Sequence, residues 1–285
     1  MTRTLLSLGH GYSAQALARR LPEGWRIIAT TRSPDKAARL SRQGVETVIW
    51  PGTDLGDALS QATHLLSSVA PGPEGDPVIA ALDAALRGAS HLEWAGYLST
   101  TGVYGDHGGG WVDEETPLAP STDRGRARVR AETEWQALGL PLHIFRLAGI
   151  YGPGRGPFAK LRAGTARRII KPGQVFSRIH VEDIAQVLAA SIARPDPGAI
   201  YNVCDDDPAP PQDVIEYAAR LLRVPVPPAV PIDDAEMSAM ARSFYAESKK
   251  VRNDRIKHEL GIHLKYPTYR EGLAALLAGE EAGRG

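Results

Sequence analysis

The stretch that decides the fold is Gly9-His10-Gly11-Tyr12-Ser13-Ala14, close to the start of the chain. It follows an apolar run over residues 4–8, typical of a buried strand, and leads into a helical pattern over residues 15–21. Gly9 permits a sharp turn, Gly11 lets the backbone come close to a pyrophosphate, and Ala14 lets the helix pack near the strand. The amides at the helix start, including those of Tyr12 and Ser13, and the helix dipole then favour phosphate. This pattern predicts a dinucleotide-binding site; the alternative is a merely structural turn.

The end of the second predicted strand, over residues 25–29, indicates which dinucleotide binds. A site for NAD usually has a carboxylate there that accepts from the ribose 2′-hydroxyl. Here the first carboxylate is Asp35. Arg32 instead offers a planar donor fork suited to a 2′-phosphate, and Thr31 and Ser33 add hydroxyl donors. We therefore expect NADP rather than NAD, the alternative being that Arg32 is a solvated surface charge.

Composition narrows the class of protein. The chain has 285 residues, enough for one sizeable core or for a large domain with a smaller one. With 33 basic and 33 acidic residues, no broad electrostatic field favours nucleic acid or anionic lipid. The single cysteine, Cys204, cannot form an internal disulfide, which fits a reducing cytoplasm.

No apolar run approaches the roughly 20 residues of a membrane span, and no cleavable signal follows the N-terminus. We expect a cytoplasmic protein that binds a small-molecule substrate and neither nucleic acid nor membrane. A homodimer is compatible with this sequence.

Predicted strands and helices alternate over the first half of the chain. Strands are predicted at residues 47–50, 64–69, 92–98 and 142–147, and helices at 34–43, 57–62, 77–88 and 125–138. Such alternation predicts an α/β fold with a doubly wound parallel sheet of the Rossmann type, which binds ligands at the carboxyl ends of its strands. We assign residues 1–150 to this dinucleotide-binding domain and 151–285 to a smaller substrate-side lobe. Two segments within about 177–203, namely 177–181 and 199–203, are expected to return to the main sheet.

Six further motifs follow the glycine turn. They are Asp54-Leu55, LSTTGVYG at residues 98–105, VDEETP at 112–117, RLAGIYGPG at 146–154, RIHVEDIA at 178–185 and IYNV at 200–203. In this order they resemble the short-chain dehydrogenase/reductase superfamily, specifically its extended branch of NAD(P)-dependent nucleotide-sugar epimerases and dehydratases.

The resemblance implies roles for individual residues. It implies adenine contacts at Asp54 and Leu55, and cofactor contacts at Val69, where the fourth strand ends. It also implies a hydroxyl at Thr100 that serves both the cofactor and catalysis. Tyr151 falls in the loop that runs under the nicotinamide in this family.

The resemblance fails at the catalytic helix. The family pattern is Y-G-x-S-K with a glutamate four residues later, and this chain has RGRAR at residues 124–128 with Glu132. Arg124 therefore stands in the place of the tyrosine and Arg128 in that of the lysine. In the family the lysine lowers the pKa of the tyrosine, which exchanges a proton with the substrate. Arginine has a pKa above about 12 and no acceptor lone pair, so it cannot be that base, but it can pair with an anion or polarise a carbonyl.

A group that replaces the tyrosine must come from loops at the same edge of the sheet. The candidates are Tyr104, Asp106, His107, Asp113, Glu114, Tyr151 and His180. For Tyr104, His107 and His180 a structural role is the favoured interpretation. The arginine run 124–130 is either a solvated helix face or an anion site. The histidines and Cys204 lack the spacing of a metal site, so no metal is expected.

Two hypotheses about function follow. The first is an NADP-dependent oxidoreductase or isomerase with a non-standard proton relay, acting on a small polar substrate that is anionic or nucleotide-sugar-like. The second is a catalytically silent NADP-binding sensor or scaffold that keeps the fold and the nucleotide site.

Overall fold

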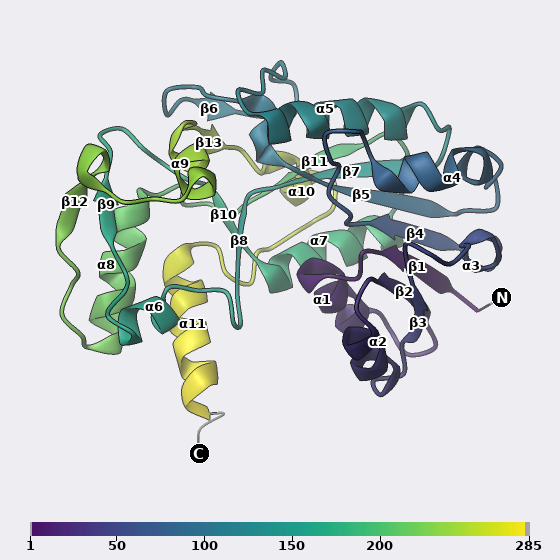
Figure 1. Ribbon diagram of the computed structural model, residues 1–285, viewed down its shortest axis with the longest axis horizontal. Coiled ribbons are helices and arrows are strands. Elements are labelled where there is room, and N and C mark those ends of the chain that lie inside the picture. Colours follow the sequence, from purple (N-terminus) through teal and green to yellow (C-terminus); the bar gives the residue numbers. More distant parts are fainter. Residues whose placement is uncertain (1, 283–285) are drawn as a thin grey trace.

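The structure is a computed structural model that describes residues 2–282. Its centre is a seven-stranded sheet in the order β11-β7-β5-β4-β1-β2-β3, with all neighbours parallel (Figure 1). The strands are β1 (Thr4–Leu8), β2 (Arg26–Thr31), β3 (Glu46–Ile49), β4 (His64–Ser67), β5 (Trp94–Thr100), β7 (Leu142–Leu147) and β11 (Ile200–Val203). This order and direction confirm the predicted α/β fold of the Rossmann type.

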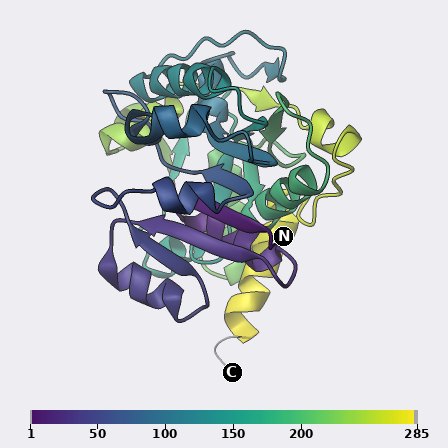
Figure 2. The ribbon, with the colours of Figure 1, turned by 90° about the vertical axis from the view of Figure 1, so that its right-hand side faces the viewer.

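Helices cover both faces of the sheet because its strands are apolar on both sides. Successive strand residues point to opposite faces, so Leu5 packs in one core cluster with Leu17 and Ile184, and Leu6 packs in another with Val78 and Trp135. The first cluster lies under α1 (Tyr12–Arg20) and α7 (Val181–Ala193). The second lies under α3 (Gly56–Ser60), α4 (Pro77–Arg87) and α5 (Asp123–Gln136), while α2 (Pro34–Ser41) packs against β2 and β3. Figure 2 views the molecule from the side of these N-terminal elements, in purple and blue.

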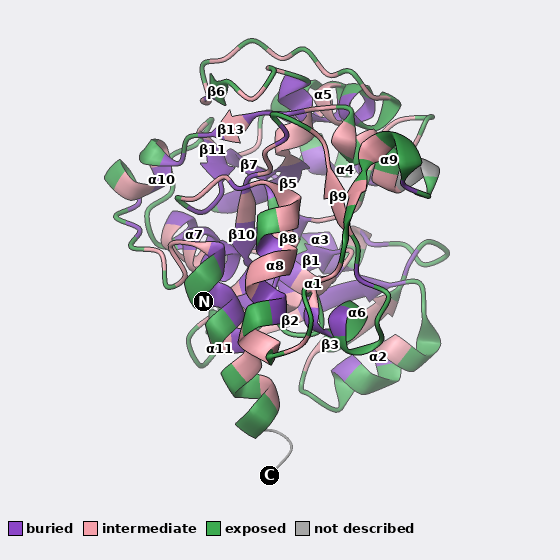
Figure 3. Cartoon of the chain, turned by 90° about the vertical axis from the view of Figure 1, so that its left-hand side faces the viewer, coloured by how far each residue is buried: buried purple, intermediate pink, exposed green. Residues whose placement is uncertain are grey.

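The remaining elements form three two-stranded parallel pairs and several short helices. β8 (Gly149–Tyr151) pairs with β10 (Arg178–His180), β9 (Arg168–Ile170) with β12 (Ala229–Pro231), and β6 (Trp111–Val112) with β13 (Lys250–Val251). The helices are α6 (Phe158–Arg162), α8 (Pro211–Leu222), α9 (Ala239–Tyr245), α10 (Asp254–His258) and α11 (Tyr269–Ala282), with 3-10 turns η1 (Thr101–Tyr104) and η2 (Ile232–Asp234). A separate apolar cluster joins α6, α8 and α11. Figure 3 shows this side, with buried residues in the strands behind and exposed ones on α9 and at the end of α11.

The two segments expected to return to the main sheet behave differently. Residues 200–203 do return, as β11 beside β7. Residues 178–180 do not: they form β10, which pairs with β8 in a separate small sheet. The free edge of β7 is taken by β11, so β10 pairs with β8, the next part of the chain after β7. The division of the chain at residue 150 remains a prediction.

No helix in the described part of the chain combines the length and the apolar character needed to cross a membrane.

Candidate functional site

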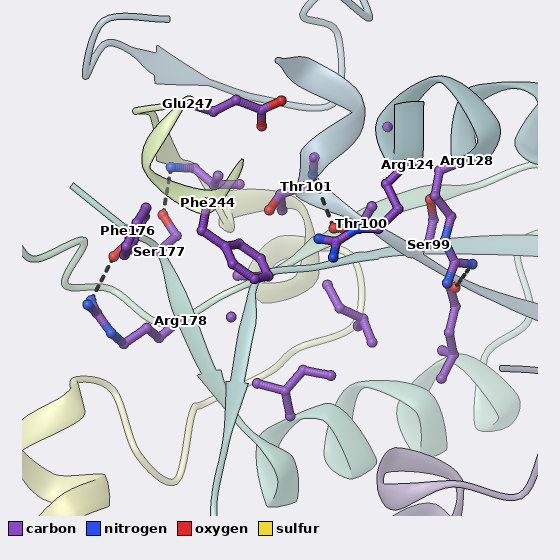
Figure 4. A pocket seen from close by; sticks show the side chains of 18 of the residues that line it. Ser99, Thr100, Thr101, Arg124, Arg128, Phe176, Ser177, Arg178, Phe244 and Glu247 are labelled. Atoms are coloured by element: carbon purple, nitrogen blue, oxygen red, sulfur yellow. Dashed lines mark hydrogen bonds between the residues drawn. The ribbon is translucent and has the colours of Figure 1, made fainter. Parts of the chain in front are cut away.

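A cleft of about 960 Å³ opens at the carboxyl edge of the sheet, between the strand ends and residues from the segments 149–155, 175–178 and 241–251 (Figure 4). Its lining includes Tyr12 from the start of α1, Thr100 from the end of β5, and Arg178 from β10. The start of α1 lies at the point where the strand order reverses, since β1 has β2 on one side and β4 on the other. Ligands of doubly wound folds bind at this switch point.

The predicted glycine turn has the strand–turn–helix geometry of a phosphate site. Gly9 has φ +71°, and a Cβ there would lie 2.8 Å from Val69 Cγ2, so the turn requires glycine. Gly9 N donates to Thr30 Oγ1 at 2.8 Å, which fixes the turn to β2. Helix α1 begins at Tyr12, and its first helical bond runs from Gln15 N to Gly11 O at 2.9 Å. The amides of residues 12–14 therefore have no acceptor within the helix.

The residues expected to hold a 2′-phosphate are the last residue of β2, Thr31, and the two residues after it, Arg32 and Ser33, and they do not line the cleft. The Thr31 hydroxyl accepts from Ser33 N at 3.2 Å, and the Ser33 hydroxyl accepts from Lys36 N at 3.2 Å as the cap of α2. Arg32 is exposed. Lys36, a residue not predicted to belong to the site, donates from Nζ to His10 O in the glycine turn. The first turn of α2 thus brings a second cation, Lys36, besides Arg32, to the end of the site next to β2.

Three more residues expected to contact the cofactor differ in exposure. Asp54 is exposed, and Val69 is half-buried against Gly9. The side chain of Leu55 is fully buried in the core cluster under α3 and α4. An adenine contact by Leu55 would therefore have to come from its backbone.

The three predicted catalytic residues come together in the cleft. Thr100 ends β5, and its hydroxyl accepts from Gly102 N at 3.1 Å. Arg128 donates from Nη1 to Tyr97 Oη at 2.9 Å and to Leu98 O at 2.8 Å, so its guanidinium is tied to β5. All three residues line the cleft.

Arg124 has a different environment from Arg128. It is exposed, and its Cζ lies 4.9 Å from the ring centroid of Phe244, on α9. Figure 4 shows Phe244 projecting into the cleft between Arg124 on one side and Arg178 on the other. Arg124 is therefore positioned to meet a bound anion.

Close packing of α5 against η1 places these arginines at the sheet edge. A Cβ on Gly125 would lie 2.9 Å from Gly102 O and 2.8 Å from Pro120 Cβ, so only glycine permits this approach. The Thr122 hydroxyl caps the helix by accepting from Gly125 N at 3.1 Å. Arg124 and Arg128 are four residues apart and therefore lie on one face of α5.

Glu132, which marks the register of the catalytic helix, is structural here. It forms an ion pair with Arg146 at 2.8 Å, with both side chains less than 5% exposed. Arg146 also donates to Tyr104 Oη at 3.0 Å, and Tyr104 donates to Asn202 Oδ1 at 2.7 Å. Burial raises the pKa of Tyr104 to about 12. Tyr104 thus takes the structural role expected for it.

Among the candidates for the missing proton carrier, Tyr151 lines the cleft and the six others do not. The Tyr151 hydroxyl donates to Thr268 O at 3.4 Å, and burial raises its pKa. His180 caps α7 by accepting from Glu182 N at 3.2 Å, and burial lowers its pKa to about 4, so the ring is neutral near pH 7.

The other candidates outside the cleft are also held by local bonds. His107 contacts Tyr104 O at 3.1 Å, and Glu114 accepts from Asn202 N at 2.7 Å. Hydrogen bonds from the backbone amides of Ser248 and Gly108 hold the pKa of Asp106 below its usual range. Asp113 accepts from Thr116 Oγ1 and Glu115 N at 2.8 and 3.1 Å.

Cations dominate the charged lining of the cleft. Five basic residues line it, namely Arg124, Arg128, Arg155, Arg178 and Lys249, against one carboxylate in the described lining, Glu247. Glu247 pairs with Lys249 at 2.7 Å. A neutral chain thus has a positive cleft, which favours anionic ligands.

Five residues line the cleft without having been predicted as part of a site, namely Arg155, Arg178, Phe244, Glu247 and Lys249. Arg178 belongs to one of the motifs shared with the family, and this was the one indication in the sequence that any of the five has a role in the site. The other four lie in segments without a regular helical or strand pattern. No group of three or more His, Cys, Asp or Glu side chains suited to a metal ion occurs among residues 2–282.

The class of protein is defined by its fold. A parallel sheet with a cleft at its switch point is the fold of NAD-dependent epimerases and dehydratases. UDP-glucuronic acid 4-epimerase from Bacillus cereus, solved in complex with NAD, superposes with a TM-score of 0.76 over 98% of this chain and 99% of its own, at 15% identity. At that identity the likeness concerns the fold. No family model matches the chain.

The chain belongs to the family of Protein YeeZ of Escherichia coli strain K12. The two are 31% identical over 281 residues, covering 91% of this chain and 95% of YeeZ. A solved structure of a functionally unknown conserved protein from Silicibacter pomeroyi DSS is 64% identical, with a TM-score of 0.93 over 98% of this chain and 100% of that one.

Proposed function

We propose that this protein is an NADP-binding, epimerase/dehydratase-like oxidoreductase or isomerase that acts on a small anionic or nucleotide-sugar-like substrate. One observation carries the proposal. A single cleft joins the glycine turn and open first turn of α1 to Thr100, Arg124 and Arg128. A dinucleotide bound at one end would thus place its reactive ring near a cationic substrate site at the other.

The residues of the glycine turn fit a dinucleotide. The amides of residues 12–14 offer donors to a pyrophosphate, and a Cβ on Gly11 would meet only Gly9 O, at 3.5 Å. Packing therefore does not require glycine at position 11, whereas close approach of a phosphate does. When bound, the nicotinamide cofactor supplies hydride transfer; the protein orients it and the substrate.

We propose that Arg124 holds the anionic group of the substrate or polarises its carbonyl, with Thr100 as hydroxyl partner. Of the two α5 arginines that line the cleft, Arg124 is the more available because Arg128 donates to Tyr97 Oη and Leu98 O. Neither can act as the base. Glu247 is the carboxylate within the described lining, and both of its oxygens are bonded, one to Lys249 Nζ and one to the Ser121 hydroxyl.

The preference for NADP is a prediction based on Arg32, an exposed guanidinium at the end of β2. We expect NADPH to bind more tightly than NADH by about 1.5–3 kcal/mol, the range of a charge-assisted contact. Arg32→Ala should remove this difference while leaving the affinity for NADH nearly unchanged. Calorimetric titration of both proteins with both cofactors measures it. Equal affinities in the wild type would refute the preference.

The second candidate function, a catalytically silent NADP-binding sensor or scaffold, is favoured by one observation. Of the candidates for the proton relay, Tyr151 is the one that lines the cleft. Its hydroxyl already donates a hydrogen bond to Thr268 O. A panel of carbonyl compounds and nucleotide sugars, assayed for NADPH oxidation by the purified protein, separates the two functions. Turnover of any member supports the enzyme, and NADPH binding without turnover across the panel supports the sensor.

We also propose a cytoplasmic location, because Cys204 is a buried free thiol. Cell fractionation tests it. The proposed partners are the cofactor and a small-molecule substrate, with no nucleic acid and no membrane; a homodimer would be seen by light scattering.

A further inference from the structure

A short turn after β8 presses the smaller lobe against the start of α1. Gly152 N donates to Arg155 O at 2.9 Å, and Arg155 N donates to Gly152 O at 2.8 Å, which closes residues 152–155 into a compact turn. Gly152 has φ +151°, and a Cβ there would lie 2.5 Å from Tyr12 Oη and 2.8 Å from Val181 Cγ1. Only glycine lets the turn come this close to α1.

Two contacts join this turn to the first residue of α1. Tyr12 Oη donates to Pro153 O at 2.9 Å, and Arg155 Cζ lies 5.1 Å from the centroid of the Tyr12 ring. Helical side chains lean toward the helix N-terminus, so the Tyr12 ring carries the guanidinium toward the end of α1 that presents free amides. Arg155, Tyr12 and Gly11 all line the same cleft.

The guanidinium of Arg155 is available to a ligand. Arg155 is exposed, and no carboxylate of the described residues lies within ion-pair distance of it. Its side chain contacts the Tyr12 ring and makes no hydrogen bond to another side chain or backbone group among the described residues. A free donor fork beside the open first turn of a helix is suited to a bridging pyrophosphate.

We propose that Arg155 binds the pyrophosphate of the dinucleotide together with the amides of α1, and that the 152–155 turn exists to hold it there. This inference rests on the proposed function, because it requires a dinucleotide in the cleft. Without Arg155, the glycine turn alone would form the pyrophosphate site. Arg155 adds a cation to that site from the smaller lobe. Cofactor binding thereby ties the two lobes together.

The rival explanation is that Arg155 only stabilises the Tyr12 ring by a cation–π contact. The chain offers a matched control for this: Arg252 Cζ lies 5.2 Å from the centroid of Trp111, in an exposed position outside the cleft. Arg252→Ala removes an arginine from an aromatic face without touching the proposed phosphate site.

The experiment uses calorimetric titration with ADP-ribose, which carries the pyrophosphate, and with adenosine, which does not. Arg155→Ala should weaken ADP-ribose about tenfold, the low end for a charge-assisted contact because the guanidinium is exposed. It should leave adenosine unchanged and make ADP-ribose binding less sensitive to salt. Arg155→Lys should recover part of the loss, and Arg252→Ala should match the wild type. Thermal unfolding of each variant confirms that the fold is retained.

The possible results separate the two proposals. If the wild type binds ADP-ribose but Arg155→Ala binds it equally well, the role of Arg155 is refuted and the proposed function stands. If Arg155→Ala weakens adenosine as much as ADP-ribose, the residue supports the fold and not the pyrophosphate, and the inference is again refuted. If the wild type binds neither ADP-ribose nor NADPH, the proposed function is refuted and this inference with it.

Discussion

Valine in place of Gly11 is expected to abolish binding of NADPH and NADH while the protein stays folded. The branched side chain would occupy the space that a pyrophosphate must enter to reach the amides of residues 12–14. The fold tolerates the change because a Cβ at this position makes only an ordinary contact with Gly9 O, at 3.5 Å. Gly11 is the N-cap of α1 at φ −91°, a value open to any residue, so the expected cost is about 1 kcal/mol for a poor cap. Calorimetry and thermal unfolding measure the two effects.

The neighbouring glycine provides the contrast. Gly9→Ala should destabilise the protein itself, because Gly9 has φ +71° and its added Cβ would lie 2.8 Å from Val69 Cγ2. Loss of binding without loss of stability is therefore specific to Gly11. A Gly11→Val protein that binds NADPH normally would show that the turn is structural and that the dinucleotide prediction is wrong.

The second large effect is expected at Arg124. Arg124→Ala should leave NADPH affinity nearly unchanged but lower turnover or substrate binding about a hundredfold, the scale for removal of a donor that stabilises charge in a site. The cleft would keep Arg128, but that guanidinium already donates to Tyr97 Oη and Leu98 O. Once the assay panel has identified a substrate, steady-state kinetics and NADPH titration give the comparison. Unchanged turnover in Arg124→Ala would contradict the proposed role.

Restoring the family pattern gives a sharper form of this test. Arg124→Tyr combined with Arg128→Lys should not improve the native reaction. The site would lose its anion partner and gain an acid that it was not built around. The silent-protein hypothesis instead expects no turnover in the wild type and only small stability effects from either change. A double variant with greatly increased reductase activity would show a decayed version of the ordinary site, and our interpretation of a specialised site would be wrong.

The sequence by itself determined the parts of this protein that depend on neighbouring residues. Gly9, the apolar run before it and the helix after it predict the strand–turn–helix unit, because φ angles, strand alternation and helical periodicity are local properties. The same holds for Arg124 and Arg128, whose spacing of four residues places them on one face of α5 wherever that helix lies. The exact start of α5 was predicted less accurately. The helix begins at Asp123 behind the Thr122 cap, two residues before the start predicted at Gly125.

Only the tertiary structure decided which distant segments meet. Leu55 follows a strand as the family pattern requires, yet its side chain packs into the core, and the Tyr151 hydroxyl turns to Thr268 O, near α11. Residues 178–180 have the pattern of a strand, but their partner is β8 because β11 takes the edge of β7. Arg155 comes to the start of α1 from a turn more than a hundred residues away, held by packing around Gly152 that no periodicity encodes. The arginine run 124–130 left an anion site and a solvated helix face as alternatives, and only long-range contacts bring Arg155, Arg178 and Lys249 into the same cleft.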